Sequence, residues 1–145
     1  MSAENTSRRL VWHGMLLFLL GLFTGFAEPH FANVRMGLTA HVEGVMNGMF
    51  LVALGAAWSL LRLSARQSAV LFWTGLYGAY GNWAASVLAA AFGTAALSPI
   101  TSAGHHGLPW QETLVTAALL SVGVTIIICT VIALRGARRL ALPLR

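Results

Sequence analysis

Four long apolar segments, separated by short polar or proline-containing stretches, dominate the pattern of this chain. They run roughly over residues 10–27, 36–61, 69–92 and 110–134. Each reaches the roughly 17 or more residues that a helix needs to cross the hydrocarbon core of a bilayer. The pattern therefore predicts an all-α integral membrane protein. Residues 1–145 are expected to form a single four-helix bundle domain that spans the membrane four times.

The stretches between the apolar segments are expected to be irregular. Residues 1–9 are expected to fray, residues 62–68 to form a polar turn, and residues 93–109 to form the longest loop. That loop contains His105 and His106, but a histidine pair without a third ligand is a weak sign of a metal site. The pair is expected to be solvated.

Composition and charge support a membrane protein and suggest its orientation. The chain is 57% hydrophobic and only 9% charged, and its mean hydropathy is +0.74. Its net charge of +5 does not indicate a nucleic-acid partner, because the arginines lie at the ends of the apolar segments. Eight of the nine fall on one side of a four-span topology, and Arg35 falls on the other. This bias predicts a multi-pass protein of the cell inner membrane with both termini cytoplasmic.

Polar side chains within the apolar segments mark a candidate site. The second segment contains His41, Glu43 and Asn47, and polar groups at membrane depth are costly and usually functional. Asn47 and Asn82, on sequence-adjacent segments, both fall roughly 15 Å below the outer surface at a rise of ~1.5 Å per residue. The two carboxamides are therefore expected either to share a cavity or to hydrogen-bond between helices.

His41 shares one helix face with Gly44, Gly48 and Gly55, which follow it at helical spacing. The face combines an imidazole with a strip that has almost no side chains. Such a strip suits either a close helix partner or a flat ring such as a porphyrin. His41 itself either ligates a metal or heme, or bonds a neighbouring carbonyl group. The residues alone leave these alternatives open.

Glu43 lies four residues before Asn47, on a different helix face. Its carboxyl group is expected to be protonated, to pair with Arg35, or to act as a working acid. Tyr77 and Tyr80 are either packing residues with satisfied hydroxyl groups or proton donors.

Several motifs in the same order resemble those of the hydroxylaminobenzene mutases. They lie at residues 18–25, 35–48, 77–83, 91–94 and 110–113. The longest reads Arg-Met-Gly-Leu-Thr-Ala-His-Val-Glu-Gly-Val-Met-Asn-Gly. The resemblance covers most of the chain and implies a small four-span isomerase that converts N-phenylhydroxylamine to 2-aminophenol. Its substrate would be a small aromatic hydroxylamine.

A more distant resemblance, to the styrene oxide isomerases, implies a cofactor. It is carried by His13-Gly14, by the spacing from His41 to Asn47-Gly48, and by Tyr80-Gly81-Asn82. It implies a homotrimer with heme b at subunit interfaces, His41 as the axial ligand of the ferric iron, and Asn47 as a substrate-orienting group. The catalytic tyrosine and aspartate of that family fall near Ser86 and Gly78, so both are missing here.

Together these features predict a membrane isomerase of arylhydroxylamines. His41, Gly44 and Gly48 are expected to bind the heme, whose iron would act as a Lewis acid. Asn47 and Asn82 would orient the substrate, and a proton would be moved by Glu43, Tyr77 or Tyr80. The alternatives are an epoxide isomerase, a non-enzymatic heme-binding membrane anchor and a small four-span transporter. The sequence assigns no role to His13 or Glu112.

Overall fold

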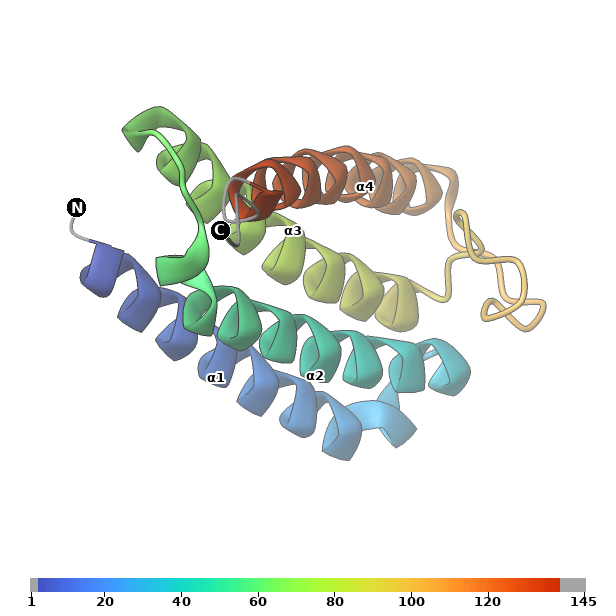
Figure 1. Ribbon diagram of the computed structural model, residues 1–145. Helices are drawn as coiled ribbons and strands as arrows, with labels where there is room; N and C mark the ends of the chain where they lie inside the picture. Colours follow the sequence, from blue (N-terminus) through green and yellow to red (C-terminus); the bar gives the residue numbers. More distant parts are fainter. Residues whose placement is uncertain (1–2, 139–145) are drawn as a thin grey trace.

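The computed structural model describes residues 3–138, and within that range it is entirely helical, without strands (Figure 1). The long helices are α1 (Ala3–Ala27), α2 (Val34–Ala56), α3 (Ala65–Phe92) and α4 (Pro109–Arg138). Single turns of 3-10 helix follow α1 and α2, as η1 (Glu28–His30) and η2 (Trp58–Leu60). The expected all-α class is confirmed for the described residues.

Two expected boundaries were wrong, one where a contact between helices holds the start of α1 and one where a local capping box starts α3. The chain is already helical from Ala3, where fraying was expected. The Ser7 hydroxyl donates a hydrogen bond to the Gly55 carbonyl at 2.7 Å, which ties this first part of α1 to α2. Likewise, α3 begins inside the expected polar turn, because Ser64 and Gln67 form a reciprocal capping box.

Three of the helices described within residues 3–138 are long and apolar enough to cross a membrane: α1 extended through η1, α2 and α4. The 28-residue α3 does not reach that hydropathy. It is instead well enclosed, with ten buried residues against eight in α2, six in α1 and four in α4. A helix that faces other helices can cross a membrane with glycine, alanine and polar side chains in place of large apolar ones. Because α3 does not reach the hydropathy of the other three helices, the fourth span stays a prediction.

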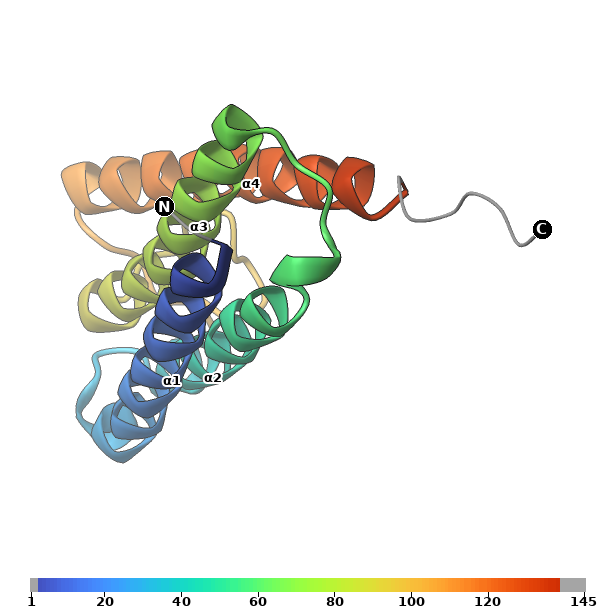
Figure 2. The same cartoon turned by 60° about the vertical axis from the view of Figure 1, so that its left-hand side comes forward.

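The helices pack in chain order, α1 on α2, α2 on α3 and α3 on α4, with a smaller contact between α1 and α3. Figure 1 shows this succession from α1 at the bottom to α4 at the top. In Figure 2, α4 lies at the top, away from α1 and α2. The main contact of α4 is with α3, and a groove lies between α2, α3 and α4.

Close approach of two glycine-bearing faces builds the α1–α2 interface. A Cβ atom added at Gly48 would lie 2.6 Å from the backbone nitrogen of Phe18, and one at Gly14 would lie 2.7 Å from the Gly48 carbonyl oxygen. One added at Gly44 would lie 2.5 Å from Cα of Gly21. Backbone therefore lies directly against backbone. The strip on α2 is covered by α1, so the structure selects the helix partner over a flat ring at Gly44 and Gly48.

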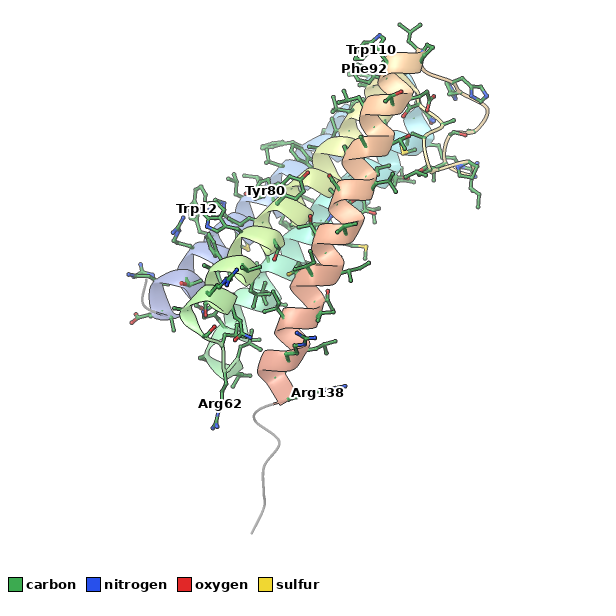
Figure 3. All side chains as sticks on the ribbon, turned by 90° about the horizontal axis from the view of Figure 1, so that it is seen from above. Trp12, Arg62, Tyr80, Phe92, Trp110 and Arg138 are labelled. Carbon is green, nitrogen blue, oxygen red and sulfur yellow. The ribbon has the colours of Figure 1, made fainter. Side chains whose placement is uncertain are left out.

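The described arginines of the predicted cytoplasmic side lie at one end of the structure. The backbone N–H of Arg62 donates to the Gly136 carbonyl at 3.3 Å, which joins the α2–α3 connection to the end of α4. Figure 3 shows Arg62 and Arg138 at this end and Trp110 at the other. Arg139 and Arg145 lie outside the described residues. The orientation relative to the cytoplasm stays a prediction.

Candidate active site

A carboxyl group on α2 lies between two carboxamides, one from its own helix and one from α3. The Nδ2 group of Asn47 donates to Oε2 of Glu43 at 3.1 Å, and Nδ2 of Asn82 donates to the same oxygen. The four-residue spacing places Glu43 and Asn47 on one face of α2. The antiparallel course of α3 brings Asn82 to the same depth. The two carboxamides lie close together, as expected, and both donate a hydrogen bond to Glu43.

Glu43 does not pair with Arg35, which was one of the alternatives. Nη1 of Arg35 instead lies 3.5 Å from the Ile100 carbonyl, in the long loop. Among residues 3–138 no cation contacts Glu43, so its only protein donors are the two carboxamides. Both bond Oε2. Oε1 therefore has no hydrogen-bond partner within the described part of the chain and is available to a ligand.

The three polar groups lie in the wall of a groove of about 420 Å³ between α2, α3 and α4. The rest of its lining is mostly apolar: Met46, Phe50, Leu119, Val122, Gly123, Ile126 and Thr130. A mainly apolar cavity with a few convergent polar groups is typical of a small-molecule site. A second cavity, of about 280 Å³, lies near Trp58 and Trp73 and is lined by no titratable side chain. The groove is therefore the better candidate.

The two tyrosines lie outside this groove. The Tyr80 hydroxyl donates to the His13 carbonyl oxygen at 3.1 Å and lies 3.3 Å from His13 Nδ1, which ties α3 to α1. The Tyr77 hydroxyl lies 2.7 Å from Oγ of Ser121, on the exposed α3–α4 surface. Both hydroxyl groups are satisfied, as the packing alternative expected. His13, to which the sequence assigned no role, is the partner of Tyr80.

His41 faces α1 and does not line the groove. Its Nδ1 lies 2.8 Å from the Gly21 carbonyl oxygen, so Nδ1 carries the hydrogen donated there, which is the tautomer that leaves the lone pair on Nε2. Gly25 makes room for the ring, because a Cβ at that position would lie 2.7 Å from Nδ1. A carbonyl bond of this kind orients many ligating histidines. The two alternatives for His41 are therefore compatible with each other.

Residues 3–138 contain no group of three or more histidine, cysteine or acidic side chains that could hold a metal ion. A metal on His41 would therefore need most of its ligands from elsewhere. Heme fits this requirement, because the porphyrin supplies four nitrogens and the protein needs to supply only an axial imidazole. Gly44 and Gly48, which were expected beside the heme, are covered by α1.

Asn33 and Glu112 hold the long loop, and neither role was expected from the sequence. The buried Asn33 caps α2 and donates to the carbonyl oxygens of Thr101 and Ser102 at 3.0 and 2.9 Å. The Glu112 carboxylate accepts three loop N–H groups, from Ala95, Ala96 and Gly107. The capping role of Asn33 could have been predicted, since asparagine is a preferred N-cap residue. The contacts of Glu112 could not, because they depend on the path of the loop.

Comparison with known proteins agrees with the two resemblances. The family model for styrene oxide isomerase matches residues 6–138. The chain is 44% identical over 133 residues to "Hydroxylaminobenzene mutase HabB" of Ectopseudomonas oleovorans, which covers 91% of this chain and 81% of that protein. It is 41% identical over 109 residues to "Hydroxylaminobenzene mutase HabA" of the same organism, with 74% and 81% covered. No solved structure shows a significant match.

These matches define the protein as an isomerase carried on a helical, membrane-type fold. The chain belongs to the styrene oxide isomerase family, and among its relatives are the two hydroxylaminobenzene mutases. The finding favours the enzyme over the two non-enzymatic alternatives, the heme-binding anchor and the small transporter.

Proposed function

We propose that this protein converts N-phenylhydroxylamine-type arylhydroxylamines to 2-aminophenols in the cell inner membrane. The observation that carries the proposal is a carboxyl group, Glu43, held by Asn47 and Asn82 in an otherwise apolar groove. The names of the two relatives supply the substrate class. An apolar arene with one polar N–OH group matches a mostly apolar groove with one polar cluster.

The reaction is an internal rearrangement and needs neither oxidant nor reductant. The N–O bond breaks, the oxygen bonds to the ortho carbon, and the proton on that carbon ends on nitrogen. A side chain that accepts one proton and returns it is therefore useful. Glu43 is the one titratable residue among those lining the groove, and its Oε1 has no partner within residues 3–138. We assign it this role.

The carboxamides hold Glu43 and orient the substrate. Each uses its Nδ2 group on Glu43, while its carbonyl oxygen Oδ1 receives no hydrogen bond from the described residues. Those oxygens can accept the N–H or O–H of the hydroxylamine. The apolar side chains of Met46 and Phe50 suit the ring. Exclusion of bulk water would also suppress capture of the activated ring by water.

Ferric heme b is the proposed cofactor, and His41 would hold it through Nε2. When bound, it would supply a Lewis acid that polarises the N–O bond. Support comes from the Gly21 bond that leaves Nε2 free and from the resemblance to the styrene oxide isomerases. Because His41 faces α1 and the groove opens on the other side of α2, the proposal includes a homo-oligomer, a trimer by that resemblance.

Product analysis of the purified protein tests the proposal. The wild type, incubated with phenylhydroxylamine in detergent without reductant, should form 2-aminophenol. Glu43→Gln should lower kcat/KM by about tenfold or more, which corresponds to ~1.4 kcal/mol of barrier. Glu4→Gln is the matched control, because Glu4 is an exposed carboxylate in the first turn of α1. No product from the wild type, or equal loss in both variants, would overturn the proposal.

Isomerisation of a styrene oxide-type epoxide is the second candidate. The family match favours it, because the matching family model describes styrene oxide isomerase. Both reactions open a bond to oxygen without redox change. Supplying styrene oxide and phenylhydroxylamine to the same preparation separates them, since the preferred substrate has the higher kcat/KM.

A further inference from the structure

Gly123 of α4 differs from every other helical glycine described within residues 3–138. At each of the others, an added Cβ atom would meet a neighbouring atom within 4 Å. At Gly123 it would meet nothing within that distance. Close helix packing therefore accounts for the other glycines and leaves Gly123 unexplained.

The contrast is clear within α4 itself. Val122 lies 3.0 Å from the Cβ position of Gly81, and Ile126 lies 2.6 Å from that of Gly78, so these two side chains pack α4 against α3. Gly123 takes no part in that packing. A glycine inside a helix costs about 0.5–1 kcal/mol relative to alanine. No contact within residues 3–138 offsets this cost, so the open space beside Gly123 is the feature that sets this position apart.

That space belongs to the groove of Glu43, Asn47 and Asn82, which Gly123 lines from the α4 side. The groove volume of about 420 Å³ falls within the roughly 300–1,000 Å³ of sites that hold drug-sized ligands. One phenyl ring with an N–OH group is smaller than such a ligand. The groove therefore has room for a larger ring system, and a side chain at position 123 would take up part of that room.

We propose that Gly123 is a specificity-determining residue, and that its missing side chain admits substituted or fused-ring arylhydroxylamines beside the parent compound. The inference rests on the proposed function, because it places the nitrogen of the substrate at Glu43 and the ring along α4. Gly123 makes no chemical contribution of its own. It sets how wide a ring system reaches the polar cluster.

The test compares two substrates in graded variants. Wild type, Gly123→Ala and Gly123→Leu are assayed with phenylhydroxylamine and with 2-naphthylhydroxylamine. Relative to the phenyl substrate, Gly123→Leu should lower kcat/KM for the naphthyl substrate by about tenfold or more, with a smaller effect for alanine. Ala117→Leu is the control, because Ala117 is exposed on α4 and does not line the groove. It should leave the substrate ratio unchanged.

A substrate ratio that stays unchanged in Gly123→Leu would overturn the inference. If the leucine variant does not fold, Gly123→Ala and Gly123→Val give the same graded comparison. If the wild type turns over neither substrate, the proposed function has failed. The role of Gly123 is then tested by ligand binding alone. Titration with fluorescent 2-naphthylamine, which has no N–O bond, should then show weaker binding in Gly123→Leu than in Ala117→Leu. Equal binding would overturn the role of Gly123.

Discussion

Asn82 of α3 donates a hydrogen bond to the Glu43 carboxyl group of α2, and this bond joins two helices at the polar cluster of the groove. Asn47 donates to the same oxygen from one turn along α2. The two carboxamides therefore act on one acceptor, and removal of either leaves Glu43 with a single donor. This shared acceptor makes the two asparagines energetically dependent on each other.

Asn47→Ala and Asn82→Ala are each expected to lower turnover per folded protein by about tenfold, which is ~1.4 kcal/mol of barrier. Because both act through Glu43, the double variant should lose less than the product of the two single losses. Steady-state kinetics of the wild type, the two single variants and the double variant gives the coupling free energy between the two asparagines. Fully multiplicative losses would show that the two carboxamides act independently.

His41→Ala is expected to abolish the Soret absorbance of bound heme together with isomerase activity. The imidazole is the proposed axial ligand, and added imidazole should restore part of both. Gly25→Ala should weaken heme retention as well, since the new methyl group would lie 2.7 Å from Nδ1 of His41. Gly123→Ala is the matched control, because its methyl group would meet no atom of residues 3–138 within 4 Å. Full heme content in His41→Ala would show that the ligand is misassigned.

Gly48→Ala is expected to destabilise the α1–α2 interface. The added methyl group would lie 2.6 Å from the Phe18 backbone nitrogen, and a helix backbone cannot move aside as a side chain can. Overpacking of this kind typically costs about 1–3 kcal/mol. The thermal unfolding midpoint in detergent should fall for Gly48→Ala and should not fall for Gly123→Ala, because alanine is the better helix former and its methyl group meets no atom within 4 Å. An unchanged midpoint for Gly48→Ala would mean that the two helices are farther apart.

Tyr80→Phe is expected to reduce stability without a matching loss of turnover. The substitution removes a hydrogen bond to the His13 carbonyl oxygen, and such a bond contributes about 0.5–1.5 kcal/mol to stability. Turnover should be retained because Tyr80 lies outside the groove. Tyr77→Phe should likewise retain activity. Measuring kcat/KM and the unfolding midpoint of both variants checks this. A loss of about tenfold or more in kcat/KM, at unchanged stability, would place that tyrosine in the chemistry.

Both termini are expected on the cytoplasmic side, because eight of nine arginines lie at that end of a four-span topology. A reporter fused to the C-terminus and active only in the periplasm should therefore give no signal. A reporter inserted in the loop of residues 93–108 should give a strong one. The reverse pattern would mean either an inverted topology or an α3 that does not cross the membrane, and equal signals at both positions would mean that α4, which separates them, does not cross.

Much of the architecture follows from the sequence alone. Long apolar segments leave a chain in lipid little choice but helix, because every backbone group must be satisfied internally. The meeting of Glu43 and Asn47 follows from a spacing of four, which one helical turn imposes. Asn82 could be placed beside Asn47 because two consecutive antiparallel spans bring known positions to one depth. The family resemblance was also readable from motifs in order along the chain.

The rotation of each helix about its axis was decided only by the tertiary structure. Helical spacing shows that His41, Gly44 and Gly48 share a face, but only the packing shows that α1 covers the two glycines. The rotation of α3 sends Tyr80 to α1 and Tyr77 to α4, while Asn82 reaches Glu43. Gly123 is an ordinary glycine in the sequence and an open position in the structure. These outcomes depend on which faces of neighbouring helices fit most closely, and that fit is a property of several segments together, which no single segment encodes.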